Sequence, residues 1–163
     1  MALMTPEQFE ESLKTLKPRV FMNGKRVESI LENKNTRTVV EANKASYAWA
    51  LNPKYKEIMT CYSPLVDDIV NRYTHVSASV DDLIKKAEAG TFTSEMLGTC
   101  IYRCVGYDAF HALASTTWEM DKELGTEYHQ RFLEYLKMVQ RKDLSVAGAL
   151  TEPRGVRSKK TLE

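Results

Sequence analysis

The chain has 163 residues, of which 43% are hydrophobic and 28% are charged. This balance is typical of a folded globular domain and excludes disorder throughout the chain. The 23 basic and 22 acidic residues nearly cancel, so no global positive field is available to bind nucleic acid. No apolar run approaches the length of about 18 residues that a membrane span requires.

The cysteine content indicates a cellular compartment. Three cysteines are present, Cys61, Cys100 and Cys104. An odd number argues against a secreted disulfide framework and favours thiols or metal ligands in a reducing compartment. The polar, acidic start is also unlike a secretory signal or a transit peptide. We therefore expect a cytoplasmic protein that contacts neither membrane nor nucleic acid.

The first elements are predicted from capping and turn residues. Thr5-Pro6 begins a helix, because a hydroxyl at the N-cap and proline at the first helical position are both favoured there. Pro18 ends that helix. Residues 19–27 predict a β-hairpin around Asn23-Gly24, the residue pair that best suits a type I′ turn. A helix is then expected over residues 36–51.

Breaks and caps divide the middle of the chain. Asn52-Pro53 interrupts the second helix and starts a short helix that runs through Met59. The pattern over residues 66–76 fits an irregular chain and an extended chain alike. Ser79 begins a further helix in a capping-box-like sequence, and Gly90 fits the C-cap of that helix.

The last third of the chain has the strongest helical periodicity. The longest pattern runs over residues 94–124 and a second runs over 126–142, whereas the glycines and proline of 144–158 predict a loop. The predicted fold class is therefore mainly α. A helical domain over residues 1–143, with one β-hairpin near its start, is expected to lead into a loop or linker segment over 144–163.

Cys100 and Cys104 are four residues apart within the predicted helix over 94–124. This spacing places both sulfurs on one helix face, about one turn apart, where two thiolates can bind one metal ion or one iron–sulfur cluster. A complete site needs about four protein ligands, so further ligands would have to come from elsewhere. The same spacing is also typical of two small side chains buried in a helix–helix seam.

Longer stretches around these cysteines resemble the 4-hydroxybutyryl-CoA dehydratase family. The stretches are GTCIYRCVGYDAF over 98–110, LGTEYH over 124–129, FLEYLK over 132–137, MTPEQFEESL over 4–13 and RVFMNG over 19–24. The resemblance covers essentially the whole chain in register. In that family two helix cysteines ligate a [4Fe–4S] cluster, and the resemblance implies this role for Cys100 and Cys104. It also implies that a histidine and a third cysteine follow in a later part of the enzyme.

Residues 149–157 resemble the flavin-binding loop of the same family. The resemblance implies that FAD is bound by Leu150, Thr151, Glu152, Pro153 and Arg157. The Thr151 hydroxyl can form a hydrogen bond, and the Arg157 guanidinium can pair with a pyrophosphate through two hydrogen bonds. Taken without the resemblance, the same residues fit a polar linker with solvated arginines.

The implied fold is the N-terminal helical domain of an acyl-CoA dehydrogenase-like enzyme, in which a β-domain and a helical bundle follow. We therefore expect the chain to be part of a longer polypeptide. The implied enzyme is a lyase that depends on FAD and a [4Fe–4S] cluster, dehydrates 4-hydroxybutyryl-CoA to crotonyl-CoA and isomerises vinylacetyl-CoA. The resemblance further implies a homotetramer acting on an acyl-CoA substrate. The chain alone is expected to be inactive, with neither cofactor stably bound, and no catalytic base is identifiable in it.

Two alternatives stay open. A FADH2-dependent aromatic hydroxylase of the 4-hydroxyphenylacetate 3-hydroxylase type shares the N-terminal fold and the flavin loop but needs no cluster, so the cysteine pair argues against it. A non-catalytic helical interaction module is the second alternative. Among the other polar residues, His111 fits either an active-site face or a hydrogen-bonded seam, and Arg72-Tyr73 fits either a structural or a substrate-facing role.

Overall fold

The computed structural model describes residues 2–16, 18–101 and 103–148. Its fold is mainly helical, as predicted. In chain order the elements are α1 (Pro6–Leu16), β1 (Val20–Met22), β2 (Lys25–Val27), α2 (Lys34–Leu51), α3 (Lys56–Met59), β3 (Thr60–Ser63), β4 (Asp68–Asn71), the 3-10 helix η1 (Arg72–Thr74), α4 (Val80–Leu97), α5 (Cys104–Leu124) and α6 (Tyr128–Lys142).

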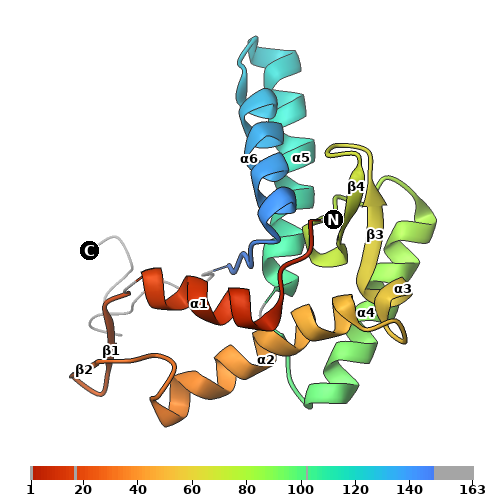
Figure 1. Cartoon of the computed structure of the whole chain (residues 1–163). Coiled ribbons are helices and arrows are strands. Elements are labelled where there is room, and N and C mark those ends of the chain that lie inside the picture. The colour runs from red at the N-terminus through yellow and green to blue at the C-terminus, as the bar shows by residue number, and fades with distance from the viewer. Residues whose placement is uncertain (1, 17, 102, 149–163) are drawn as a thin grey trace, which may run out of the picture.

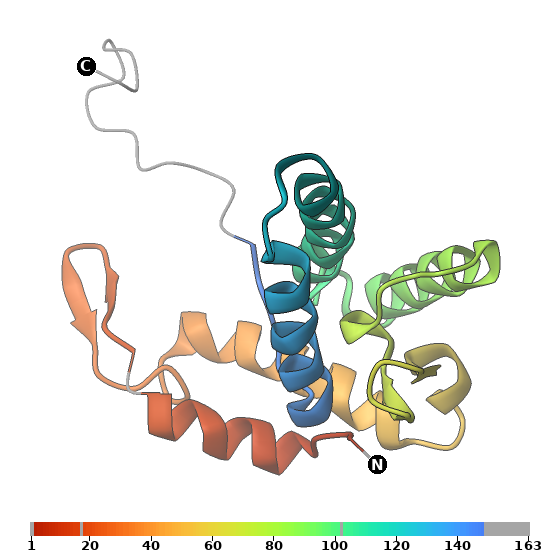
Figure 2. The ribbon, with the colours of Figure 1, turned by 90° about the horizontal axis from the view of Figure 1, so that it is seen from above.

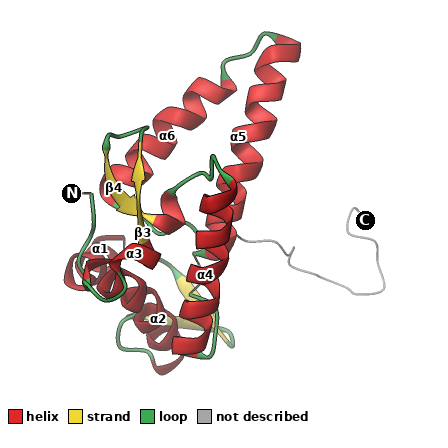
Figure 3. Cartoon of the chain, turned by 90° about the vertical axis from the view of Figure 1, so that its right-hand side faces the viewer, coloured by secondary structure: helices red, strands yellow, loops and turns green. Residues whose placement is uncertain are grey.

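The helices form two groups that meet near the middle of the molecule (Figure 1). Helices α1 and α2 lie side by side, and the hairpin of β1 and β2 extends from their outer end (Figure 2). Helices α5 and α6 pack along each other and project away from the rest of the fold (Figure 3). Helix α4 and the hairpin of β3 and β4 lie beside the base of this projecting pair.

The predicted start of the chain is confirmed. Thr5 and Gln8 cap α1 reciprocally, since each side chain accepts a hydrogen bond from the backbone N–H of the other residue, at 2.9 and 3.1 Å. Strands β1 and β2 pair in an antiparallel register, with Val20 opposite Val27. The turn between them has positive φ at Asn23 (49°) and Gly24 (74°), as a type I′ turn requires.

The structure adds a second hairpin to the one that was predicted. Strands β3 and β4 pair antiparallel, with Thr60 opposite Asn71 and Ser63 opposite Asp68. The connecting turn places Asp67 at φ 53°, a left-handed conformation that aspartate adopts more readily than most residues. The prediction left 66–76 undecided because neither strand shows a strong alternating pattern, and pairing between the strands supplies the order that local sequence does not.

The boundary between α4 and α5 differs from the prediction. Helix α4 passes through Gly90 and ends at Leu97, so Gly90 is not its C-cap. Gly98 follows at φ 64°, and its N–H donates to the Ser94 carbonyl over 2.8 Å. Glycine adopts this left-handed conformation without the steric penalty of a Cβ atom. The single helix expected over 94–124 is therefore two helices, one ending at Leu97 and the next beginning at Cys104.

Three clusters of buried apolar side chains make up the core in the described part of the chain. The cluster next to Cys104 consists of Ala50, Met59, Tyr73, Ile101 and Tyr107. The cluster between α5 and α6 consists of Phe110, Phe132, Leu136 and Val139. The cluster between α1 and α2 consists of Phe9, Val40 and Tyr47. No helix in the described residues is long and apolar enough to span a membrane.

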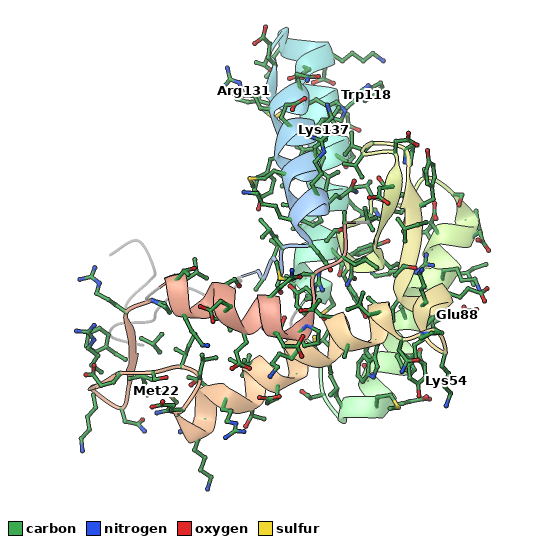
Figure 4. All side chains as sticks on the ribbon, in the orientation of Figure 1. Met22, Lys54, Glu88, Trp118, Arg131 and Lys137 are labelled. Carbon is green, nitrogen blue, oxygen red and sulfur yellow. The ribbon has the colours of Figure 1, made fainter. Side chains whose placement is uncertain are left out.

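The outer part of the α5–α6 pair carries exposed polar and aromatic side chains. Trp118, Arg131 and Lys137 are labelled there in Figure 4. Trp118 is 53% exposed, and the Lys122 ammonium lies 5.2 Å from the centre of its ring. Trp118 therefore lies on a solvent-exposed part of α5, whereas Tyr107 and Phe110 near the start of the helix are buried.

Candidate metal centre

The two cysteines of the predicted site lie where α4 gives way to α5. Cys100 lies two residues after Gly98, the C-cap of α4, and Cys104 is the first residue of α5. Their sulfur atoms are only 2.7 Å apart, and the residues are thiols rather than a disulfide. The structure thus brings the predicted pair together, but through the turn of a loop onto a helix and not through one helix face. The signal for this boundary was Gly98, whose position after an apolar helix end fits a C-cap.

The surroundings of the pair are protein on one side and solvent on the other. Cys100 is exposed, whereas Cys104 is partly buried and packs against the cluster of Ile101 and Tyr107. Tyr73 lies in the same cluster, and its hydroxyl is 3.1 Å from the Thr93 hydroxyl. The buried apolar cluster therefore lies on one side of the pair. The other side is open to solvent, where further ligands could approach.

The thiol chemistry suits a soft metal that displaces protons. Burial, together with the neighbouring Cys100 sulfur, raises the pKa of Cys104 to about 11. Because the thiolate is the metal ligand, binding a cation here would release protons and cancel the repulsion between two adjacent thiolates. Among the described residues, no group of three or more His, Cys, Asp and Glu side chains could hold a metal ion. The pair fits half of a cluster site.

A short segment after α6 lies across the first turn of α5. Residues 144–148 pass so close that a Cβ atom on Gly106 would collide with the Val146 carbonyl, and a Cβ atom on Gly148 would collide with the Val105 side chain. Glycine at both positions permits this close approach. The segment therefore contacts the helical turn that begins at Cys104.

Substitution of Gly106 by alanine tests this packing. We expect Gly106→Ala to destabilise the chain by about 1–3 kcal/mol, the usual cost of forcing extra atoms into a packed site. Gly90→Ala is the matched control, because Gly90 lies inside α4 with open space around the added Cβ and alanine is favoured over glycine in a helix by about 0.5–1 kcal/mol. Urea unfolding of both variants checks the opposite signs, and a Gly106→Ala variant as stable as the wild type would contradict the close packing.

The predicted flavin-binding residues fall outside the described part of the chain. This applies to Leu150, Thr151, Glu152, Pro153 and Arg157, because the described residues end at residue 148. The described segment 144–148 leads into that stretch from the first turn of α5. The predicted FAD loop therefore begins directly after a segment that packs against Val105 and Gly106.

His111 is a seam residue in this structure. Its Nε2 accepts a hydrogen bond from the Ser77 backbone N–H over 2.8 Å. The ring proton must therefore be on Nδ1, which lies 3.0 Å from the Tyr107 carbonyl and donates to it. With both ring nitrogens engaged, His111 joins α5 to the segment before α4 and is not directed to the cysteine pair.

Arg72 also has a structural role. Its buried guanidinium donates to three backbone carbonyls, those of Ile58 (2.7 Å), Glu57 (3.0 Å) and Thr60 (2.7 Å). These carbonyls lie at α3 and the start of β3, where a helix end leaves acceptors without intrahelical partners. Arg72 therefore satisfies a buried helix end, which decides between the two roles that its sequence context allowed.

Sequence reasoning missed a buried ion pair next to the cysteines. Arg103 directly precedes Cys104, and its guanidinium lies 2.8 Å from the Asp143 carboxylate. The two side chains are 1% and 0% exposed. A charged residue inside a predicted helix would ordinarily face solvent, and its partner lies 40 residues further along the chain, so no local pattern signalled the pair.

Comparison with known proteins finds similar sequences and structures among 4-hydroxybutyryl-CoA dehydratases. The 4-hydroxybutyryl-CoA dehydratase/vinylacetyl-CoA-Δ-isomerase of Clostridium aminobutyricum is 41% identical over 155 residues, which are 95% of this chain and 32% of that protein. An oxygen-tolerant archaeal 4-hydroxybutyryl-CoA dehydratase from N. maritimus has a similar structure, with a TM-score of 0.89, 35% identity, and coverage of 97% of this chain and 31% of that chain. The chain thus spans about a third of the length of these relatives.

More distant structures share the fold. The oxygenase component of 4-hydroxyphenylacetate 3-monooxygenase matches with a TM-score of 0.74 and 21% identity, covering 97% of this chain and 33% of that chain. A structure of such an oxygenase in complex with FAD and 4-hydroxyphenylacetate matches with a TM-score of 0.69 and 19% identity. The sequence model of the family described as 4-hydroxyphenylacetate 3-hydroxylase N terminal matches residues 5–163. The chain therefore belongs to the 4-hydroxyphenylacetate 3-hydroxylase N-terminal family.

Proposed function

We propose that this chain forms the N-terminal part of a dehydratase that depends on FAD and a [4Fe–4S] cluster and converts 4-hydroxybutyryl-CoA to crotonyl-CoA. The observation that carries the proposal is the convergence of the Cys100 and Cys104 sulfurs on an outward-facing surface. The 41% identity to the clostridial dehydratase/isomerase supports it. Isomerisation of vinylacetyl-CoA is included in the proposal, on the same similarity.

In the proposed enzyme this chain holds the metal group from one side. The cluster, when bound, would supply a Lewis-acid iron atom for the leaving hydroxyl, and FAD would supply one-electron chemistry. Cys100 and Cys104 would hold the cluster through their thiolates. The buried side chains of Ile101 and Tyr107 close the protein side of the pair, so water is excluded there.

The remaining parts of the proposal concern residues and partners beyond the described site. FAD binding is assigned to Leu150, Thr151, Glu152, Pro153 and Arg157, and the FAD complex of a family relative supports a flavin in this fold. A homotetramer acting on an acyl-CoA substrate is proposed for the whole enzyme. We also propose a cytoplasmic location, because reducing conditions keep cysteines available as metal ligands.

An aromatic hydroxylase is the second candidate function. The family description names 4-hydroxyphenylacetate 3-hydroxylase, and one matching structure holds FAD together with 4-hydroxyphenylacetate. That enzyme type needs no cluster, so it gives no reason for two sulfurs to converge at the surface. The lower identity, 19% compared with 41%, also favours the dehydratase.

A direct activity comparison tests the proposed function. The complete gene product, purified without oxygen, is assayed for the conversion of 4-hydroxybutyryl-CoA to crotonyl-CoA. In parallel it is assayed with reduced flavin, oxygen and 4-hydroxyphenylacetate. We expect crotonyl-CoA and no hydroxylated aromatic product. Hydroxylation without dehydration would establish the second candidate instead.

The 163-residue chain alone is expected to bind no stable cluster. It supplies two converging thiols, and a compact cluster needs about four protein ligands. Anaerobic incubation with iron and sulfide, then desalting, then an absorption spectrum of the thiolate-to-iron charge-transfer region, measures this. A stoichiometric cluster that survives desalting would show that the two cysteines suffice without ligands from elsewhere.

A further inference from the structure

The ion pair of Arg103 and Asp143 is built into the centre of the fold. The Arg103 guanidinium donates to the Asp143 carboxylate (2.8 Å), to the Ser46 hydroxyl (3.2 Å) and to the Leu144 carbonyl (3.5 Å). It also lies over the Tyr47 ring, 4.6 Å from the ring centre. The burial of the pair therefore comes with polar and aromatic contacts from α2 and from the segment after α6.

Asp143 also connects the N-terminal segment, α2 and the end of α6 through its hydrogen bonds and its place in the chain. It follows the last residue of α6 in a left-handed conformation, with φ 46°. Its second carboxylate oxygen accepts from the Met4 N–H over 3.2 Å, and its backbone carbonyl accepts from the Tyr47 hydroxyl over 3.1 Å. The N-terminal segment, α2 and the end of α6 are thus joined to Arg103 through one carboxylate residue.

This junction fixes the place where α5 begins. Arg103 is the N-cap residue of α5, and its carbonyl accepts from the Tyr107 N–H over 3.0 Å. Cys104 follows directly, and the loop that carries Cys100 begins at Gly98, whose N–H is bonded to the Ser94 carbonyl. Gly98, in its left-handed conformation, and Arg103, through its buried guanidinium, therefore fix the backbone on either side of Cys100.

A buried ion pair is a weak source of stability, because desolvation of both charges offsets most of their attraction. Apolar residues in the same place would often give an equally stable fold. A guanidinium–carboxylate contact also fixes the relative orientation of the two side chains, because the planar N–H donors form good hydrogen bonds only over a narrow range of carboxylate positions. A directional contact suits a residue whose neighbour must be held at a defined place.

We propose that the Arg103–Asp143 ion pair is a positioning device that holds the Cys100 and Cys104 sulfurs together and keeps residues 144–148 against the same turn of α5. Arg103 is a positioning residue, since it acts through the backbone of Cys104 and through the Leu144 carbonyl. The purpose of this geometry, the binding of a cluster beside a flavin, rests on the proposed function. The geometry itself can be tested without any metal.

Thiol–disulfide exchange in the metal-free 163-residue chain measures how well the fold holds the two sulfurs together. Cys100 and Cys104 are oxidised to a disulfide with loss of two protons, while one glutathione disulfide is reduced to two glutathione thiols. The equilibrium constant of this exchange gives the effective concentration of one thiol at the other. Cys61→Ser is included in every variant, so that only the pair reacts.

Three variants separate positioning from stability. Arg103→Met/Asp143→Asn removes both charges while asparagine still tolerates the left-handed backbone. We expect this double variant to stay folded and its exchange constant to fall about tenfold, because small displacements of preorganised groups have large effects. Arg103→Lys keeps the positive charge but lacks the planar guanidinium. Its exchange constant should lie between those of the double variant and the wild type. Arg72→Lys, a change at another buried guanidinium, should leave the constant unchanged.

The outcomes decide the proposal. An unchanged exchange constant in the folded double variant would overturn it, as would an equal fall in Arg72→Lys. A wild-type pair that exchanges no more favourably than two unlinked thiols would overturn it as well. Failure of the proposed function gives a different result. The complete gene product would then contain no cluster, while the exchange constant of the double variant would still be lower than that of the wild type.

Discussion

Replacement of Cys100 or Cys104 by serine is expected to abolish cluster binding and dehydratase activity in the complete enzyme. Serine keeps the size of the side chain but removes the thiolate that iron requires. Loss of residues that only support metal ligands already costs about 10–100-fold in metal affinity or activity, so loss of a ligand should cost at least about 100-fold. Iron and sulfide content per chain, together with the rate of crotonyl-CoA formation, measures the effect.

Cys61→Ser is the matched control for this prediction. Cys61 lies on β3, opposite Val70 of β4, in a different element from the Cys100–Cys104 pair. This variant should retain its iron, its sulfide and its activity. Full iron content in Cys100→Ser and in Cys104→Ser would contradict the assignment of the pair, whatever the activity.

Arg103→Met is expected to destabilise the chain by about 3–5 kcal/mol, because it leaves the buried Asp143 carboxylate without its charged partner. Methionine has a similar length and no charge, so the change removes the ion pair without opening a large cavity. The loss is much larger than that expected from an ordinary surface substitution. Urea unfolding followed by far-UV circular dichroism measures it as a lower midpoint.

Two comparisons make this result specific. The double variant Arg103→Met/Asp143→Asn should recover most of the lost stability, since no buried charge is then left unpaired. Lys14→Met, which breaks an exposed ion pair with Glu11, should leave the midpoint almost unchanged, because solvent screens such pairs. A single variant as stable as the wild type would show that the Asp143 carboxylate is satisfied without Arg103.

Local sequence was sufficient to predict the elements that begin or turn at a characteristic capping or turn residue. Thr5-Pro6 marked the start of α1, Asn23-Gly24 marked the turn of the first hairpin, and Ser79 marked the start of α4. Each of these residues satisfies or replaces a backbone hydrogen bond within its own neighbourhood, so its effect can be recognised without the rest of the chain.

The structure departs from the prediction where distant contacts decide. Gly90 and Gly98 both fit a C-cap by local sequence, and the prediction chose the first, whereas the helix continues through Gly90 and ends before Gly98. The second hairpin depends on the pairing of β3 with β4. Arg103 is buried because Asp143 and Ser46 meet it from other elements, and such partners are not marked by any local pattern.

The candidate site divides in the same way. The Cys100–Cys104 spacing, together with the resemblance around it, was enough to single out the pair. The reason that the sulfurs meet was not accessible, because it is a loop that turns into a helix and is held by a buried ion pair. The cysteine pair, the ion pair and the segment 144–148 meet where α5 begins.

The most direct measurement for the central claim is the position of iron in the complete gene product. Crystals grown from anaerobically purified protein would be measured on both sides of the iron absorption edge. The proposed function predicts a compact group of iron atoms bonded to the sulfurs of both Cys100 and Cys104. Iron bonded to neither sulfur, or a map without iron at this position in a catalytically active crystal, would contradict it.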